Sequence, residues 1–189
     1  METEGAYILR ENTGTSGIEA TLRTAVAMLE HWDIPHLVAG GLAVQEHGYF
    51  RVTLDADIIV PDVQEAVEFL ISDLTGPFVR FPPGCEDTVQ DRRNGVHINF
   101  LPAGRVLRRG CQVPFPEPRQ VSPRPVFISL GELISLKLDS WTHSPMRRHK
   151  DKTDVIELIK SKHLPRELAV ADPVRAAYTE TWDALRTEE

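Results

Sequence analysis

VAGGLAVQEHGYFRVTLDADIIVP, residues 38–61, carries the most informative pattern of the chain. The apolar residues before the paired glycines predict a short strand, and LAVQEHG after them predicts a short helix that Gly48 ends. The run LDADIIV, residues 54–60, predicts a second strand. Because alternate residues of a strand point to the same side, we expect Asp55 and Asp57 on one face of the sheet.

Two carboxylates at this spacing predict a metal site. Like charges that close repel each other, and a divalent cation between them relieves the repulsion. Mg²⁺ (or Mn²⁺) takes carboxylate oxygens together with substrate phosphates, so Asp55 and Asp57 are the candidate ligands. Gly40 and Gly41 lie at the junction of strand and helix, where glycine allows main-chain N–H groups to approach a triphosphate closely.

A family resemblance covers the same stretch. With Arg51 and Thr53 ahead of the aspartates, the spacing GG-x13-D-x-D resembles the signature of the nucleotidyltransferase superfamily, and R-V-T-x-D-A-D resembles its minimal-nucleotidyltransferase and AbiEii toxin-like branches. The resemblance implies an α/β (α+β) fold: a small mixed sheet with flanking helices, forming a nucleotidyltransferase-like core, followed by a helical C-terminal part. It also implies that the glycines, Arg51 and Thr53 bind the nucleotide and that the two aspartates bind Mg²⁺.

The third carboxylate of that family stands on a later strand, where it shares the metals and often acts as the base. Residues 95–101, GVHINFL, predict this strand, and the matching position is Asn99, with His97 on the same face. An amide oxygen can ligate a hard cation, but it carries no negative charge and cannot act as a general base. Three acids before the strand are substitutes only if the intervening loop folds back: Glu86, Asp87 and Asp91.

The helices expected near the C-terminus carry further charged candidates. On a helical wheel, Lys137 falls within an apolar stripe, so its side chain either snorkels outward or points into a cleft. The resemblance implies that this lysine contacts the nucleotide phosphates. KDKTDVIELI, residues 150–159, resembles the family's KD-x-x-D segment, which assigns Asp151 and Asp154 to nucleotide binding. Asp151 alternatively caps the helix in which it stands.

The whole chain is expected to form one compact unit, with an α/β core over residues 1–125 and a helical part over 126–189 packed on it. The periodicity and the start and stop signals predict a set of elements. The expected helices cover about 17–32, 63–74, 129–141, 150–161 and 173–185, in addition to the short one after the glycines. The expected strands cover about 36–39, 54–60, 78–81, 95–101 and 126–128.

The composition excludes several classes of protein. The chain has 189 residues and a formal net charge of −7, so a nucleic-acid acceptor would need a local basic patch such as RVLRR, residues 105–109. Its two cysteines make no zinc pattern. The N-terminal METEGAYILRENTG has no apolar segment of a signal peptide, and no window resembles a membrane span, so we expect a cytoplasmic protein without membrane contact.

Two functions follow from these observations. The first is a Mg²⁺-dependent nucleotidyltransferase that moves a nucleoside monophosphate from an NTP to a hydroxyl of RNA, protein or a small molecule. The second is a catalytically weakened or inactive protein of the same fold that binds a nucleotide or a partner, for which Asn99 is the argument. The toxin-like branch adds an antitoxin-like protein as a candidate partner. A phosphatase of the haloacid-dehalogenase type is disfavoured, because FRVTL rather than an apolar strand precedes the aspartates.

Overall fold

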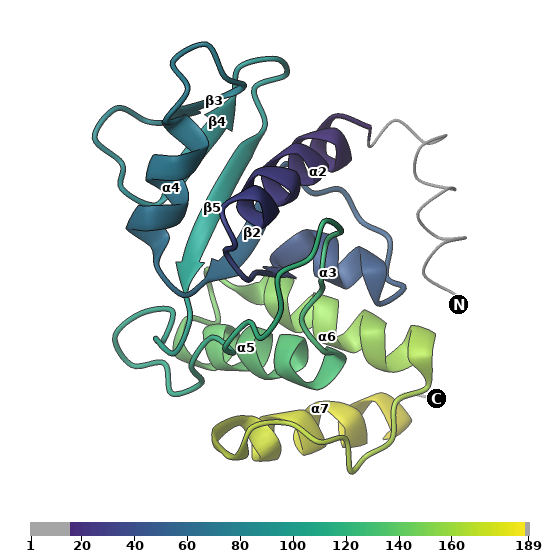
Figure 1. The fold of residues 1–189 in the computed structure, drawn as a ribbon. Helices are drawn as coiled ribbons and strands as arrows, with labels where there is room; N and C mark the ends of the chain where they lie inside the picture. The colour runs from purple at the N-terminus through teal and green to yellow at the C-terminus, as the bar shows by residue number, and fades with distance from the viewer. Residues whose placement is uncertain (1–15, 188–189) are drawn as a thin grey trace.

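The computed structural model describes residues 16–187, so the expectation drawn from METEGAYILRENTG lies outside the described residues. Five strands form one sheet in the order β1-β2-β5-β4-β3 (Figure 1). The strands are β1 (Leu37–Ala39), β2 (Asp55–Val60), β3 (Phe78–Arg80), β4 (Thr88–Asp91) and β5 (His97–Pro102). The pairing of β2 with β5 is parallel and the other three pairings are antiparallel, so the sheet is mixed.

Helices flank this sheet and continue beyond it. They are α2 (Ser16–His31), α3 (Gly40–Glu46), α4 (Val63–Ile71), α5 (Leu130–His143), α6 (His149–Lys162) and α7 (Arg175–Thr187), with the 3₁₀ turn η1 (Asp172–Val174) before α7. Figure 1 shows α5, α6 and α7 gathered at the lower end of the sheet, while α2 and α4 lie beside its upper part. The small mixed sheet, flanking helices and helical C-terminal part expected from the sequence are confirmed.

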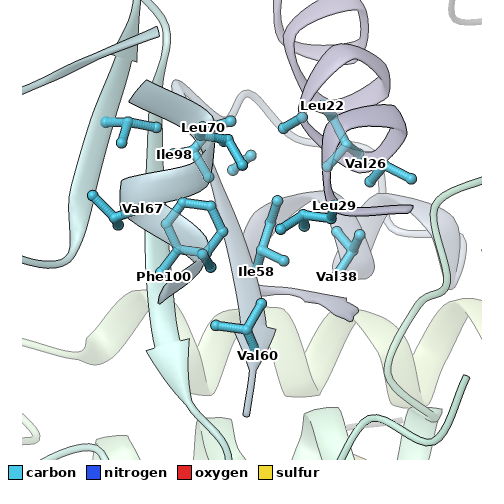
Figure 2. Packing of buried hydrophobic residues seen from close by; sticks show 14 of the residues in the cluster. Leu22, Val26, Leu29, Val38, Ile58, Val60, Val67, Leu70, Ile98 and Phe100 are labelled. Carbon is cyan, nitrogen blue, oxygen red and sulfur yellow. The ribbon is translucent and has the colours of Figure 1, made fainter. Parts of the chain in front are cut away.

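The first core fills the space between one face of the sheet, α2 and α4. Alternation along β2 and β5 turns Ile58 and Phe100 to this side, where they are buried against Leu29 of α2 and Leu70 of α4 (Figure 2). Each fully buried side chain of this kind contributes about 1.5–3 kcal/mol by leaving water. This core fixes the orientation of β2 and β5, and with it the direction of the residues on their other face.

The second core lies on that other face, at the ends of the strands. Ile59 of β2 packs there with Ile134 and Leu138 of α5 and with Leu158 of α6. A capping box at Ser129, with reciprocal bonds to Glu132, starts α5 at the expected place. Toward the beginning of β2 the same face carries no apolar residue, so polar side chains occupy the border between the sheet and the C-terminal helices.

Some expectations differ from the structure. Strand β4 was not predicted, because TVQD offers only Val89 as an apolar residue. Residues 126–128 form no strand; Phe127 makes an isolated parallel bridge to Val38 at the edge of the sheet. Helix α4 ends at Ile71, three residues earlier than expected. The paired glycines do not precede α3 but are its first two residues.

Among residues 16–187, no helix combines the length and the apolar composition that crossing a membrane requires. The division of the chain at residue 125 stays a prediction.

Candidate functional site

An aspartate pair and an asparagine lie side by side on the neighbouring strands β2 and β5. Asp57 of β2 is directly opposite Asn99 of β5 in the parallel register, and Asp55 is opposite His97. Asn99 Nδ2 donates to Asp57 Oδ1 at 3.1 Å and to Asp55 Oδ2 at 3.4 Å. The Thr88 hydroxyl donates to Asn99 Oδ1 at 3.3 Å, so the amide is held from both ends. The two carboxylates therefore converge on one point of the sheet, as alternation in β2 predicts.

Negative charge is concentrated where the Asp55 and Asp57 carboxylates meet. Burial raises the pKa of Asp57, and the neighbouring Asp55 and Asp151 raise it further, while the Asn99 amide and Lys137 act in the opposite sense. Two carboxylates held together by an amide donor are a costly arrangement without a cation. Their hard oxygen atoms fit Mg²⁺ or Mn²⁺, and Asp55 and Asp57 are the residues that would hold it. Asn99 turns its nitrogen toward them, so here it is a donor to the pair.

The glycine pair packs directly against these side chains. Gly40 has a φ of 61°, and a Cβ atom at this position would clash with the Asp57 carboxylate. A Cβ at Gly41 would lie 2.8 Å from Thr53 Cβ. Both positions therefore require glycine for close approach, and Gly40 also requires it for its left-handed conformation. The start of α3 thus lies in contact with the aspartate pair, at the edge where β1 ends.

In the segment between α3 and β2, side chains alternate between buried and exposed positions as in a strand, although the segment forms no strand. Arg51 and Thr53 are turned inward, and Thr53 Oγ1 donates to Asp55 Oδ1 at 3.3 Å. The intervening Val52 and Leu54 are exposed. Buried Gln45 of α3 donates its side-chain amide to the main-chain oxygen of Arg51 and so anchors the segment.

A network of ion pairs joins this segment to the C-terminal helices. Arg51 Nε and Nη2 donate to the two oxygens of Asp154 at 2.6 and 2.9 Å. Lys137 Nζ lies 2.6 Å from Asp154 Oδ2 and 3.1 Å from Asp151 Oδ1. Asp154 is fully buried, so one carboxylate from α6 holds both cations in place. Lys137 therefore points into the protein from the apolar stripe of α5 rather than snorkelling outward.

Of the three acids considered as substitutes for the third carboxylate, Asp91 is turned away from the aspartate pair. The buried Asp91 side chain accepts from Thr21 of α2 at 2.7 Å and from Arg93, so its carboxylate faces α2. Although burial raises the pKa of Asp91, the Arg93 and Thr21 hydrogen bonds outweigh it and hold the pKa below its usual range. Asp87 accepts from Thr88 at 3.0 Å, and Glu86 is exposed. Asp91 was a candidate only if the loop before β5 folded back, and alternation along β4 instead places it on the face opposite Thr88, against α2.

Other residues lie around the site, and two of them, Thr88 and Ser140, were not singled out by the sequence. Thr88 orients Asn99, and Ser140 Oγ donates to Asp151 Oδ2 at 2.9 Å. His97 stacks on Phe81 with ring centroids 5.0 Å apart, and its Nε2 lies 2.9 Å from Gln90 Nε2. Prediction of β4 would have placed Thr88 beside Asn99, whereas no sequence signal marks Ser140.

Neither the protein-family models nor the curated proteins include a match to this chain. Among solved structures, the chain is similar to the antibiotic-resistance factor ANT(2'')-Ia, with a TM-score of 0.46 and 16% sequence identity over 90% of this chain and 97% of that one. The solution structure of that protein is described as revealing substrate-regulated conformation dynamics. The likeness concerns the fold alone, and none of the residue assignments depends on it.

Proposed function

We propose that this protein is a metal-dependent nucleotidyltransferase that transfers a nucleoside monophosphate from an NTP to a hydroxyl group. The observation that carries the proposal is the convergence of Asp55 and Asp57 on one face of the sheet, in direct contact with the glycine turn at Gly40. The cations Arg51 and Lys137 lie beside this point, held by the same buried carboxylate. A metal–triphosphate complex requires three kinds of group: carboxylates that bind the divalent cation, small residues that let the phosphates approach, and cations that neutralise the phosphate charge.

Each residue has a distinct part in the proposal. Asp55 and Asp57 hold Mg²⁺, which when bound neutralises the triphosphate and stabilises the charge that develops on the leaving pyrophosphate. Main-chain N–H groups near Gly40 and Gly41 approach the phosphates, because no side chain intervenes there. Arg51 and Lys137 supply positive charge to the same oxygens. Asp151 and Asp154 act by orienting these two cations, since carboxylates themselves repel phosphate.

The transfer forms a bond between the acceptor oxygen and the α-phosphorus and breaks the bond from that phosphorus to pyrophosphate. The acceptor hydroxyl must lose its proton, and Asn99 cannot take it. We therefore expect slow transfer unless the acceptor or solvent supplies the base. RNA, protein and small molecules remain the three acceptor classes, and an antitoxin-like partner remains a prediction from the toxin-like branch.

The test is incubation of the purified protein with each α-labelled NTP and Mg²⁺ or Mn²⁺, together with total RNA, total protein or a mixture of small hydroxyl compounds. We expect label to move to one acceptor class and pyrophosphate to appear in equal amount. Asp57→Asn should abolish both signals, whereas Glu180→Gln, which neutralises an exposed carboxylate on α7, should leave them unchanged. Transfer that persists in Asp57→Asn would overturn the proposal.

Asn99 favours a second function, that of a nucleotide-binding or partner-binding module without catalysis. Its amide donates to both aspartates, and Asn99 is the position of the sequence that matches the base of the family it resembles. This function predicts metal-dependent NTP binding without label transfer to any acceptor. The incubation and a binding measurement on the same protein distinguish the two functions.

A further inference from the structure

A second group of metal-ligating side chains lies in the C-terminal half of the chain. Cys111 is in the loop that follows β5, while Asp139 and His143 are one turn apart on α5. One ligand atom from each of these residues lies within 4.8 Å of the other two, and in residues 16–187 they form the one such group of three. Cys111 and Asp139 are buried, whereas His143 is partly exposed and opens the group to solvent.

The Asp139 carboxylate shows that this group is unsatisfied. Its Oδ2 accepts the main-chain N–H groups of Gln112 and Val113 at 2.9 and 3.0 Å, which fixes the side chain. Its Oδ1 is buried and has no hydrogen-bond partner, although it lies 3.3 Å from His143 Nδ1. A buried carboxylate oxygen without a donor is costly, so such an oxygen indicates a missing cation or proton.

The contacts of His143 occupy one of its ring nitrogens and leave the other for a ligand. His143 Nδ1 lies 2.9 Å from the main-chain oxygen of Asp139, and a proton on Nδ1 would leave the lone pair of Nε2 for a ligand. The Cδ2–Nε2 edge of the ring faces Gly110, the residue before Cys111: a Cβ atom added at Gly110 would lie 3.2 Å from Cδ2 and 3.9 Å from Nε2. The residue next to the thiol thus packs against the free edge of the ring.

We propose that Cys111, Asp139 and His143 bind a transition-metal ion, with Zn²⁺ as the best chemical fit. Zn²⁺ is bound by thiolate, imidazole and carboxylate ligands, and a water molecule completes four-coordination where a site opens to solvent. Binding releases the thiol proton to solvent, and the resulting thiolate and carboxylate balance the charge of the ion. Arg108 brings one positive charge near Cys111, which reduces the affinity.

The ion would clamp the loop that carries Cys111 onto α5. The clamp is structural and does not depend on the proposed function, because its three ligands are none of the residues assigned to nucleotide or Mg²⁺ binding. It acts on the helix that carries Lys137 and Ser140, so its loss would loosen the support of the ion-pair network. The spacing of these residues explains why the sequence shows no metal pattern, since 28 positions separate Cys111 from Asp139.

The test uses the full chain, first stripped of metal with a chelator and then titrated with Zn²⁺ or Co²⁺. We expect at least one equivalent of Zn²⁺ to bind, and Co²⁺ to produce the near-ultraviolet charge-transfer band of a cobalt–thiolate bond. Cys111→Ser should abolish the band, and His143→Gln should reduce the stoichiometry. Cys85→Ser removes the other free cysteine and is the matched control that should keep both signals.

The cobalt–thiolate band is measured first in the wild-type protein, so the test does not depend on whether the variants fold. Absence of the cobalt–thiolate band in the wild-type protein overturns the proposal. Zn²⁺ binding that Cys111→Ser leaves unchanged overturns it as well, since the ion would then lie elsewhere. Asp57→Asn should retain the band, which separates this site from the aspartate pair.

Discussion

Asp57 is the residue at which most contacts of the candidate site meet. Gly40 lies behind its carboxylate, Asn99 donates to it from the neighbouring strand, and Asp55 lies on the same face of β2. Burial and Asp55 both raise its pKa, so its charged form is held at a cost. The Asn99 amide lowers this cost by hydrogen bonding, where a third carboxylate would have increased it.

Asn99→Asp tests that balance. The variant replaces two amide donations with a third negative charge in nearly the same volume, so the metal-free protein should become less stable. Divalent affinity should increase, and any transfer should accelerate by about 10²- to 10⁴-fold if the new carboxylate acts as a base. Thermal unfolding with and without Mg²⁺, together with the transfer assay, measures these effects. Unchanged metal affinity with lower activity would show that Asn99 does not occupy the place of the third acid.

Gly40→Ala tests the close approach of the glycine turn. The added Cβ meets the Asp57 carboxylate, so metal-dependent NTP binding should be lost. Gly84→Ala is the matched control, because Gly84 also has a positive φ, of 85°, but no atom lies within 4 Å of the added Cβ. Both variants suffer a backbone penalty of about 1–2 kcal/mol, measured by denaturant unfolding. Equal NTP binding in the two variants would contradict the contact.

Helices α5 and α6 carry most of the charged side chains of the ion-pair network beside the site. Asp154 of α6 accepts from Arg51 and pairs with Lys137 of α5, so one buried side chain joins the segment before β2 to both helices. Cations held in this way lose little freedom when a triphosphate binds. The helices therefore contribute to the site through orientation as well as through packing.

Asp154→Asn should destabilise the protein by about 3 kcal/mol, since breaking a buried ion pair leaves its partners without compensation. Urea unfolding measures the change. The control is Asp183→Asn, whose pair with Arg166 is 46–49% exposed at both side chains and should contribute far less to stability, because solvent screens it. A loss for Asp154→Asn as small as that of the control would show that Arg51 and Lys137 do not depend on Asp154.

The helices and strands that could be predicted from the sequence are those whose own residues show a clear pattern. Strand β2 has alternation and an apolar run, and α5 has its capping box and stripe, so Asp57 and Lys137 were placed in their elements. Strand β4 has a single buried apolar residue and depends on pairing with β3 and β5, which no local pattern reveals. For the same reason, Asp91 was considered for the site and Thr88 was missed. The roles of the site residues stay predictions.

The whole molecule combines two apolar cores that meet at the edge strand β1. Val38 belongs to the core under α2 and α4, whereas Ala39 belongs to the core of the C-terminal helices. The main chain of Val38 also bonds to residues 126 and 128, which closes this edge. His36, just before β1, is fully buried, and burial lowers its pKa.

The His36 environment predicts how stability depends on pH. In the unfolded chain the His36 side chain has a pKa of about 6.5, and below this pH the unfolded state binds a proton that the folded state resists. The free energy of unfolding should therefore decrease as the pH is lowered, by up to about 1.4 kcal/mol per pH unit. His36→Gln should flatten this dependence between about pH 7 and pH 5, in urea unfolding at several pH values. His31→Gln, at an exposed position, should retain the wild-type slope. An unchanged slope in His36→Gln would refute the assignment.

Metal-dependent NTP binding is the most direct test of the proposed function, because it does not require a known acceptor. Calorimetric titration of the wild-type protein with each NTP should show binding in the presence of millimolar Mg²⁺ and none with a chelator. Asp55→Ala and Asp57→Ala should each abolish that binding, since the triphosphate charge would lose its counter-ion. Wild-type protein that binds no NTP with Mg²⁺, or binds it equally well after both substitutions, would contradict the assignment of this site.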